Sequence, residues 1–584
     1  MTDIRIETDV LIVGSGPAGS SAAALLASMG VRTHVITKYR WTANTPRAHI
    51  TNQRAMEIFR DLGIEQQVLA EAVPHHLMGD TVFCTSLTGE ELGRMHTWGT
   101  SPERHADYES ASPTLNCDIP QNLLEPILIR TAAERGAVVR FSTEFVSFEQ
   151  DDDGVTVLVR DRLTGEEFHI RAKYLLGADG ARSVVAAQAG LQYEGKMDIA
   201  GSMNITFKAD LSHLVAHRPS VLYWVLQPGS NIGGIGMGLV RMVRPWNEWL
   251  IVWGYDITQP PPEVDEAAAI QIVRNLVGDQ ELEVEITGTS LWGNNEMYAT
   301  TLQNGRVYAM GDAIHRHPPS NGLGSNTSIG DSYNLAWKIA YALKGWAGEK
   351  LPTTYEPERA PVAKQIVLRA NKSGAEFGPI FEALGVLGTN DPEQMNRNIA
   401  SRVENTPEAR ERRRALTKAI ELKNYEFNAL GVELGQFYQS SAVMPDGTEK
   451  PAPTKDPELY YEPTTYPGCR LPHAWLLKDR QKVSTHDLAR FGEFTLFTGI
   501  TGQAWADATV EVARELGIPL NAVVVGPGQQ VTDLYNDWER LSQIEEDGAV
   551  LVRPDKHVAY RSHGMVDDPK AALMDALNGI LARA

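Results

Sequence analysis

The sequence has few cysteines, no long apolar run and no signal-like start, and each shortage excludes a class of protein. Only three cysteines occur in 584 residues, at Cys84, Cys117 and Cys469. They stand far apart, so they form neither a disulfide framework nor a spaced thiolate metal site. No stretch approaches the roughly twenty consecutive apolar residues of a membrane span, and the N-terminus lacks the basic start and apolar core of a signal peptide. We therefore expect a cytoplasmic protein.

An excess of positive charge is also missing. The chain has 54 Lys and Arg against 74 Asp and Glu, a formal net charge of -20, and its basic residues are scattered. This charge repels polyanions, which argues against nucleic acid and anionic membranes as partners. Hydrophobic residues make up 42% and charged residues 22%, as in soluble globular enzymes. We expect several subdomains, a small-molecule substrate and a homo-oligomer.

The clearest pattern that is present is a glycine-rich turn near the N-terminus. Residues 9–13 are apolar, residues 17–29 are strong helix formers that end at Gly30, and residues 31–36 are β-branched, which predicts a β-α-β unit. Missing side chains at such a turn let backbone amides approach a pyrophosphate. The residues expected to bind it are Gly14, Gly16, Pro17, Ala18 and Gly19. The turn alone does not distinguish NAD from FAD.

The end of the second strand departs from the usual nucleotide-binding pattern. An acidic residue that bonds the adenosine ribose is expected there, but the chain has Thr37 and Lys38. A hydroxyl can still bond ribose, and the ammonium group can reach a phosphate. The alternative is that the strand ends in a solvated basic turn.

The rest of the chain divides by its composition. Aromatic and β-branched runs at Val221 and Trp249 predict an antiparallel sheet over residues 191–289. A strand near Gly305 and a helix over about residues 327–343 again have the pattern of a nucleotide-binding domain. We therefore expect residues 1–190 and 290–395 to form one domain. A helical segment and Pro-rich linker occupy residues 396–472. Residues 473–584 have the strand and helix order of a thioredoxin-like fold without its Cys-x-x-Cys.

Two later motifs decide between the dinucleotides. They are YLLGADGARSVV, which contains Asp179, and RVYAMGDAIHRHPPSNGLGSNTSIGDSYNLAWK, which contains Asp312. With the glycine-rich turn they resemble the three fingerprints of flavoprotein aromatic hydroxylases, over about residues 5–365. The segments KYRWTANTPRAHITNQRAMEIFRDLG and CDIPQNLLEPIL resemble the phenol hydroxylase branch of that family, and the thioredoxin-like tail is typical of it too.

The resemblance implies an α/β fold. A Rossmann-like FAD-binding domain would be interleaved with an antiparallel-sheet substrate domain and followed by a C-terminal thioredoxin-like domain. It also implies FAD as cofactor and NADPH, or NADH, as co-substrate. Oxygen activated on the reduced flavin would be transferred to a phenol-like ring at the position ortho to its hydroxyl.

The resemblance also places individual residues at the cofactor. Asp179 would serve FAD and NAD(P)H near the pyrophosphate, Asp312 would bond the ribityl chain, and Arg47 and Gln121 would lie beside the flavin. In the third motif, a helix start can aim free amides at the flavin pyrimidine, and an ordinary helix capped by Ser325 or Thr327 can hold at the same time. The contacts expected in this motif are Pro319, Gly322, Gly324, Ser325 and Asn326.

Four residues are candidates for the chemistry on the substrate, two of them as alternatives for one role. Related phenol hydroxylases place an acidic group near the position of His49 to help ionise the substrate hydroxyl, and a histidine can accept a proton near neutrality. The alternative is a structural histidine. Tyr223 is a weaker candidate to hydrogen-bond the ring oxygen, and Arg241 or Arg244 can replace an active-site arginine that does not align cleanly.

Other interpretations compete with the hydroxylase. His315 and His317 have spacing compatible with metal binding, but without a carboxylate or cysteine partner we expect no metal. A halogenase on the same scaffold is disfavoured because its W-x-W-x-I-P signature is absent. A hydroxylase of a hydroxypyridine-like natural-product intermediate and a non-catalytic flavin-binding regulatory or assembly protein both remain open.

Overall fold

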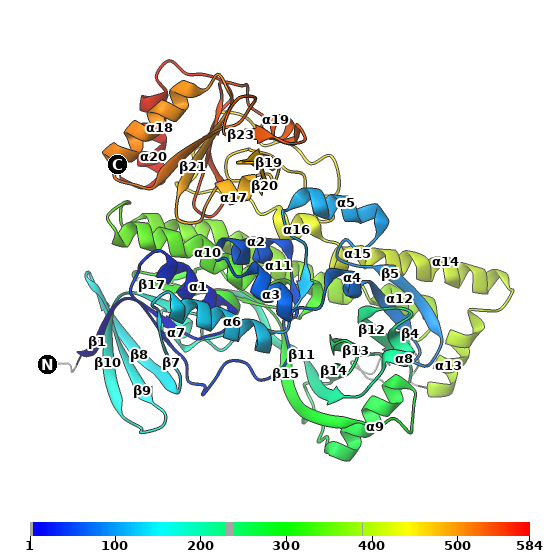
Figure 1. The fold of residues 1–584 in the computed structure, drawn as a ribbon. Coiled ribbons are helices and arrows are strands. Elements are labelled where there is room, and N and C mark those ends of the chain that lie inside the picture. The colour runs from blue at the N-terminus through cyan, green and yellow to red at the C-terminus, as the bar shows by residue number, and fades with distance from the viewer. Residues whose placement is uncertain (1–3, 229–236, 388, 390, 584) are drawn as a thin grey trace.

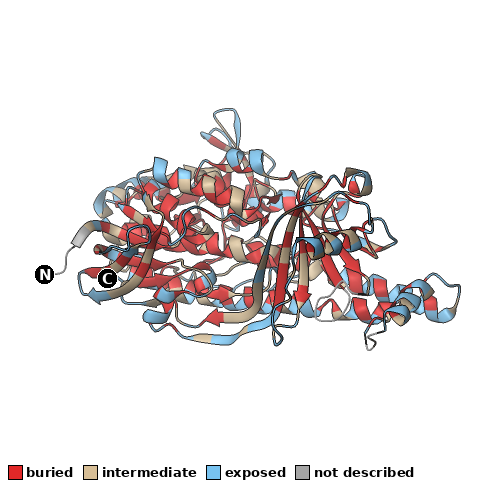
Figure 2. Cartoon of the chain, turned by 90° about the horizontal axis from the view of Figure 1, so that it is seen from below, coloured by how far each residue is buried: buried red, intermediate tan, exposed pale blue. Residues whose placement is uncertain are grey.

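The fold is taken from a computed structural model that describes residues 4–228, 237–387, 389 and 391–583. Figure 1 shows two sheet-containing parts side by side and a third part, formed by the C-terminal residues, above them. Figure 2 shows that buried residues run through both sheets, while exposed residues gather on outer helices and loops. The candidate site lies where the two sheet-containing parts meet.

The first sheet collects strands from two separate parts of the chain. Its strands are β1 (Ile4–Val13), β2 (Thr33–Ile36), β7 (Val138–Arg140), β8 (Thr143–Asp151), β9 (Gly154–Asp161), β10 (Glu167–Gly177), β16 (Gln303–Asn304) and β17 (Val307–Ala309). The order is β16-β17-β10-β1-β2-β7, with β9 paired antiparallel to β10 and β8 paired antiparallel to β9. The pairs from β17 to β7 are parallel, as β-α-β units require. Because β17 follows β11 to β15 of the second sheet in the chain, the two sheets are interleaved.

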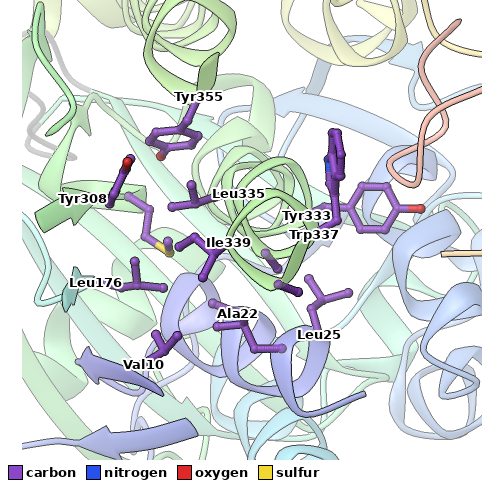
Figure 3. Close-up of a cluster of buried hydrophobic side chains, with 14 of the residues drawn as sticks. Val10, Ala22, Leu25, Leu176, Tyr308, Tyr333, Leu335, Trp337, Ile339 and Tyr355 are labelled. Atoms are coloured by element: carbon purple, nitrogen blue, oxygen red, sulfur yellow. The ribbon is translucent and has the colours of Figure 1, made fainter. Parts of the chain in front are cut away.

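Helices cover this sheet, and two of them pack directly on each other. The helices of this part are α1 (Pro17–Ser28), α2 (Gln53–Asp61), α3 (Glu65–Glu71), α6 (Gln121–Glu134), α7 (Val184–Gln188), α10 (Leu323–Leu343) and α11 (Tyr355–Ala375). Ser332 of α10 donates a hydrogen bond to the carbonyl of Ala18 in α1, at 2.7 Å. Figure 3 shows the apolar side chains of α1 and α10 close to Val10, Leu176 and Tyr308 of the first sheet. The core therefore fixes both helix starts that face the expected cofactor.

Helix α10 begins earlier than the sequence predicts. It starts at Leu323 instead of about residue 327, because Gly322 takes a left-handed conformation with φ of 63° and ends the preceding turn. The next four residues are thereby drawn into the helix. The N-terminal amides consequently lie within the glycine-rich loop itself.

The second sheet is mostly antiparallel and includes strands from outside residues 191–289, where the sequence predicts it. Its strands are β4 (Asp80–Cys84), β5 (Glu91–His96), β11 (Tyr193–Lys208), β12 (Ser220–Leu226), β13 (Met237–Arg244), β14 (Glu248–Tyr255), β15 (Glu285–Ala299) and β18 (His315–Arg316). They are ordered β18-β15-β11-β14-β13-β12-β4-β5. Strands β4 and β5 come from residues that the sequence interpretation assigned to the nucleotide-binding unit. Local patterns show that a strand is buried but not which sheet it joins.

Helices complete this second part and connect it to the tail. They are α4 (His75–Met78), α5 (Pro102–Ala111), α8 (Ser212–Val215), α9 (Glu266–Val277), α12 (Gly378–Leu384), α13 (Pro392–Ser401), α14 (Pro407–Leu422), α15 (Asn424–Phe427) and α16 (Leu430–Leu434). Buried side chains of α9, α12 and α14 belong to the same apolar cluster as the sheet. None of the helices in the described ranges combines the length and apolarity that a membrane span needs.

The C-terminal part has a four-stranded sheet of thioredoxin-like order. Its elements are β19 (Trp475–Lys478), β20 (Gln481–Ser484), α17 (Thr485–Leu488), β21 (Phe494–Thr498), α18 (Gln503–Leu516), β22 (Leu520–Val524), β23 (Val531–Asp533), α19 (Asp537–Ser542), β24 (Ala549–Val552), β25 (Val558–Ser562) and α20 (Pro569–Ile580). The order is β22-β21-β24-β25, with β21 and β22 parallel around α18 and the other pairs antiparallel. The predicted fold class is confirmed.

Buried ion pairs join the C-terminal part to the first part. Glu358 of α11 accepts hydrogen bonds from Arg553 and from Lys338 of α10, and all three side chains are buried. Arg553 also pairs with Asp555 at 2.5 Å. In α2, Arg54 donates to the carbonyl of Asp555 at 2.9 Å. The tail therefore contacts the same helices, α2 and α10, that border the candidate site.

Candidate active site

The glycine-rich turn leaves no room for side chains. A Cβ at Gly14 would lie 2.1 Å from the carbonyl oxygen of Ala178, and one at Gly19 would lie 2.0 Å from that of Gly14. Gly16 precedes α1, and no side chain caps that helix. No hydrogen bond among the described residues uses the amides of Ser15, Gly16, Ala18 or Gly19. Strand, turn and helix thus present free amides at a positive helix end, which suits a pyrophosphate.

The two residues after the second strand differ in their surroundings. Thr37 is buried, its hydroxyl accepts a hydrogen bond from the amide of Tyr39 at 3.5 Å, and its amide donates to Arg140. Lys38 is exposed, with its ammonium 5.6 Å from the ring centre of Tyr39. Thr37 therefore shapes the turn, and Lys38 is the one of the two that is open to a charged ligand.

Glu125, which the sequence interpretation did not name, links the segments that carry Gln121 and Arg47. One carboxylate oxygen accepts a hydrogen bond from the amide of Ala43 at 2.6 Å, and the other accepts one from the side chain of Gln121. The amide of Gln121 donates to the carbonyl of Arg47 at 2.8 Å. Burial raises the pKa of the Glu125 carboxyl, and its hydrogen bonds oppose that rise. The four-residue spacing from Gln121 within α6 is the sequence signal that could have found it.

The two motif aspartates have different environments. Asp179 accepts hydrogen bonds from the amides of Val184 and Val185, at 2.7 and 3.2 Å, and so caps α7. Asp312 is exposed to solvent, but the protein that surrounds it reduces the hydration of its carboxyl and so raises the pKa of that group. Nearby basic groups oppose this rise. A carboxyl that is both accessible and closely surrounded lies in a recess. Arg47, also exposed, contributes to the charge around it.

The start of α10 resembles that of α1. No side chain caps it, so the alternative of an ordinary helix capped by Ser325 or Thr327 does not describe it. A Cβ at Gly322 would lie 2.9 Å from the Cβ of Ile50. Asn326 donates to the carbonyl of Ile50 at 2.8 Å and accepts from the amide of Asn52 at 3.0 Å. Asn326 therefore holds the segment around His49 against α10, while Pro319, Gly324 and Ser325 lie in the loop and first turn.

His49 belongs to a buried polar cluster that the sequence did not reveal. Its Nδ1 lies 3.4 Å from Oδ1 of Asp118, and Arg241 Nη2 lies 2.5 Å from Oδ2 of the same carboxylate. All three side chains are at most 6% exposed. Neither ring nitrogen of His49 has a hydrogen-bond partner among the described residues. Burial lowers the pKa of His49 to about 4, with Arg241 adding to the fall and Asp118 opposing it.

Tyr223 is not part of this cluster. Its hydroxyl donates to the carbonyl of Arg218 and accepts from the amide of Ser220, both at 3.0 Å. Leu222 pairs with Arg241 across β12 and β13, while Tyr223 pairs with Val240. Because neighbouring residues of a strand face opposite ways, Tyr223 points away from the sheet face that carries Arg241. Arg244 also points elsewhere, to Glu71.

The histidines of the third motif are engaged within the protein. His315 Nε2 lies 3.0 Å from Asp331, a carboxylate partner that the sequence interpretation did not foresee. Asp331 is occupied as well by Arg359 and the amide of Gly311. His317 contacts the carbonyl of Pro318 at 2.6 Å, and burial lowers its pKa to about 4. The described residues contain no group of three or more metal-ligating side chains.

Two hollows of the surface lie elsewhere. One, of about 410 Å³, is lined by α5, residues 455–463 and α19. The other, of about 660 Å³, is lined by the ends of β11 and β14 and the start of β15. Neither includes a residue of the cluster around His49 or of the glycine-rich turns, so we assign no part of the site to them.

The residues present fit FAD. Two uncapped helix starts suit the phosphates and the electron-rich flavin ring. The turn at Gly14 and Gly19 excludes any side chain, and Asp312 offers an accessible carboxylate in a recess. These features come from the three motifs that predicted the cofactor.

Comparisons with known proteins agree with this fit. A family described as FAD binding domain matches residues 7–370, and one described as aromatic-ring hydroxylase, C-terminal, matches residues 464–584. A phenol 2-monooxygenase of Pseudomonas sp. (strain EST1001) is 62% identical over 576 residues, covering 98% of this chain and 93% of the relative. A 2,4-dichlorophenol 6-monooxygenase of Delftia acidovorans is 56% identical, covering 98% of both chains.

Solved structures support the same conclusion. The flavin-dependent monooxygenase PieE, in complex with FAD and substrate, has a TM-score of 0.94 and 43% identity over the full length of both chains. Aklavinone-11 hydroxylase, in complex with FAD and aklavinone, has a TM-score of 0.81 and 29% identity, also over both full lengths. From these matches, and from a site that fits the cofactor, we conclude that the chain belongs to the FAD-dependent aromatic-ring hydroxylases.

Proposed function

We propose that this monooxygenase hydroxylates a phenol-like ring ortho to its hydroxyl group, with NADPH as the preferred electron donor and O2 as the oxygen source. The activities named for the relatives with 55–62% identity support a phenol as substrate. The observation that carries the proposal is a buried imidazole, that of His49, whose nitrogens have no hydrogen-bond partner among the described residues. A site without a proton acceptor would not suit a phenol.

The FAD would be held by residues of the three motifs. We assign the pyrophosphate to the turn of Gly14, Gly16, Pro17, Ala18 and Gly19, with Lys38 at its rim. Asp312 would bond the ribityl chain, and the first turn of α10 would face the flavin ring. When bound, FAD supplies the redox chemistry that passes electrons from NAD(P)H to O2 and makes an oxygen atom available to the ring.

His49 would act on the substrate hydroxyl. The phenol O–H bond breaks, the electron pair stays on the phenol oxygen, and the proton moves to Nε2 of His49. The negative charge on oxygen enriches the ortho carbon in electrons, which prepares that carbon to take up oxygen. A general base of this kind contributes roughly 10²–10⁴-fold to the rate.

The sheet face beside this cluster would hold the ring and exclude water. Leu222 and Leu250 are the cross-strand partners of Arg241 on this face, and both are at most 7% exposed. An apolar wall of this kind favours an uncharged aromatic ring. It also keeps water from competing for the activated oxygen.

A panel of phenols and hydroxypyridines tests the proposed function. Purified FAD-containing enzyme is given NADPH or NADH with each compound, and both donor oxidation and hydroxylated product are measured. We expect product from simple or chlorinated phenols, formed in proportion to donor consumed, with faster turnover on NADPH. If FAD is bound but no ring compound gives hydroxylated product, the proposal fails and a non-catalytic flavin protein is favoured.

The pKa of His49 predicts the pH profile. A base must be unprotonated to accept the phenol proton, and the pKa of about 4 keeps His49 neutral at higher pH. The hydroxylation rate should therefore stay level from neutral pH down to about pH 5 and fall only below it. An unshifted histidine would cause the fall near its ordinary value of about 6.5. His49→Asn is the control. Its residual hydroxylation rate should not show this fall at low pH, because the titrating base has been removed.

Three further expectations belong to the same proposal. The net charge of -20 supports partners that are neither nucleic acid nor anionic membrane. The cytoplasm is the proposed compartment, because three cysteines scattered along the chain suit a reducing environment. We also propose a homo-oligomer, and size-exclusion chromatography with light scattering measures it directly.

A further inference from the structure

Asp118 occupies the centre of the cluster around His49. It lies in β6 (Cys117–Asp118), which pairs with β3 (Ile50–Thr51) in a two-residue antiparallel ladder. The amide of Ile119 donates to the carbonyl of His49 at 2.8 Å, which extends the pairing to the histidine itself. The backbone pairing therefore holds His49 and Asp118 next to each other, independently of the contact between their side chains.

The two carboxylate oxygens of Asp118 have different partners. Oδ2 accepts a charge-assisted hydrogen bond from Arg241, while Oδ1 has no hydrogen bond among the described residues and lies 3.4 Å from Nδ1 of His49. Asp118 is fully buried, so solvent does not compete for Oδ1. The ion pair with Arg241 holds the pKa of Asp118 below its usual value despite burial.

An ionised Asp118 limits the tautomers open to His49. A neutral imidazole has one N–H and one lone pair. A proton on Nδ1 would face the carboxylate favourably, whereas a lone pair on Nδ1 would face its negative charge. The arrangement thus favours the Nδ1–H tautomer and leaves the lone pair on Nε2, away from Asp118.

We propose that Asp118 is a positioning residue for the hydroxylation. It orients the His49 ring, selects the tautomer with a free Nε2 lone pair, and stabilises the imidazolium that forms when Nε2 takes the phenol proton. Arg241 acts in turn on Asp118, keeping it ionised and aligned, and not on the substrate directly. The inference rests on the proposed function, because it assumes that His49 is the base.

The test is Asp118→Asn assayed on phenols of increasing acidity. The series runs from unsubstituted phenol through chlorophenols to a nitrophenol that is already ionised at the assay pH. If Asp118 acts through the base, the hydroxylation rate should fall by roughly 10²-fold for the least acidic phenol. The loss should shrink along the series and nearly vanish for the ionised phenol, which has no proton to give.

A double-mutant cycle separates positioning from a general structural effect. Once His49→Asn has removed the base, adding Asp118→Asn should change the hydroxylation rate little, because the two residues act as one unit. FAD content and melting temperature are measured for each variant. An equal loss on every phenol, or independent losses at the two positions, would overturn the inference.

A second variant provides the same test if Asp118→Asn alone does not fold. Asp118→Asn leaves Arg241 buried without its counter-ion, which is costly, whereas Asp118→Asn with Arg241→Met leaves no unpaired charge. The same dependence on phenol acidity is expected in this double variant. If the unmodified enzyme hydroxylates no phenol, the proposed function itself fails. If it does and the variants lose activity uniformly, only the role of Asp118 fails.

Discussion

Gly14→Ala is expected to produce protein that no longer retains FAD. The added Cβ would lie 2.1 Å from the carbonyl oxygen and 2.6 Å from the carbonyl carbon of Ala178. Both are backbone atoms of the segment that follows β10, so no side-chain movement can relieve the contact. The turn must shift, and the amides that would hold the pyrophosphate shift with it. The ratio of flavin to protein absorbance after purification measures the loss.

Gly136→Ala is the matched control for this change. Gly136 has φ of 100°, close to the 107° of Gly14, but a Cβ added to it would meet no heavy atom within 4 Å. The substitution therefore carries the same backbone strain, on the order of 1–3 kcal/mol, without the collision. It should lower stability and keep FAD. Loss of FAD in both variants would show that strain, and not the close approach to Ala178, explains the result at Gly14.

Glu358→Gln is expected to destabilise the attachment of the C-terminal part severely. The carboxylate accepts hydrogen bonds from Arg553 at 2.6 and 2.9 Å, from Lys338 at 2.7 Å and from Asn334 at 2.6 Å. Glu358, Arg553 and Lys338 are buried. Removing the negative charge leaves two buried cations with less compensation, and breaking such a pair costs about 3–5 kcal/mol. The expected result is a lower melting temperature and earlier proteolysis near residues 440–470.

Glu167→Gln provides the control for that prediction. It makes the same change in an ion pair with Arg160 whose side chains are 43% and 46% exposed. Water screens such a pair and solvates the remaining arginine. Its melting temperature should stay close to that of the unmodified protein. If Glu358→Gln behaves in the same way, the buried cluster does not hold the C-terminal part in place.

The cofactor motifs were readable in the sequence because they are local. A pyrophosphate site needs strand, turn and helix in immediate succession, and Gly14, Gly16 and Gly19 lie within six residues. The third motif likewise carries its own helix start. Resemblance to a family then separated FAD from NAD, which the turn alone did not do.

The sequence predicted less of the substrate side because contacts there are distant along the chain. Asp118 lies 69 residues after His49 and 123 residues before Arg241, and only the pairing of β3 with β6 brings the first two together. The sequence offered Tyr223, as a weaker candidate, and Arg241 for the substrate side. Strand pairing places only Arg241 on the sheet face of the cluster around His49, because cross-strand partners share a face and neighbours in sequence do not.

By itself the sequence determined the fold class, the cofactor and the family, since short-range patterns and long matching segments carry that information. Only the tertiary structure decided that β4 and β5 join the second sheet, that Asp118 stands between His49 and Arg241, and that buried ion pairs attach the tail. Those features depend on which distant segments pack together, and burial makes the charged groups of the Asp118 cluster and of the tail costly to separate from their partners.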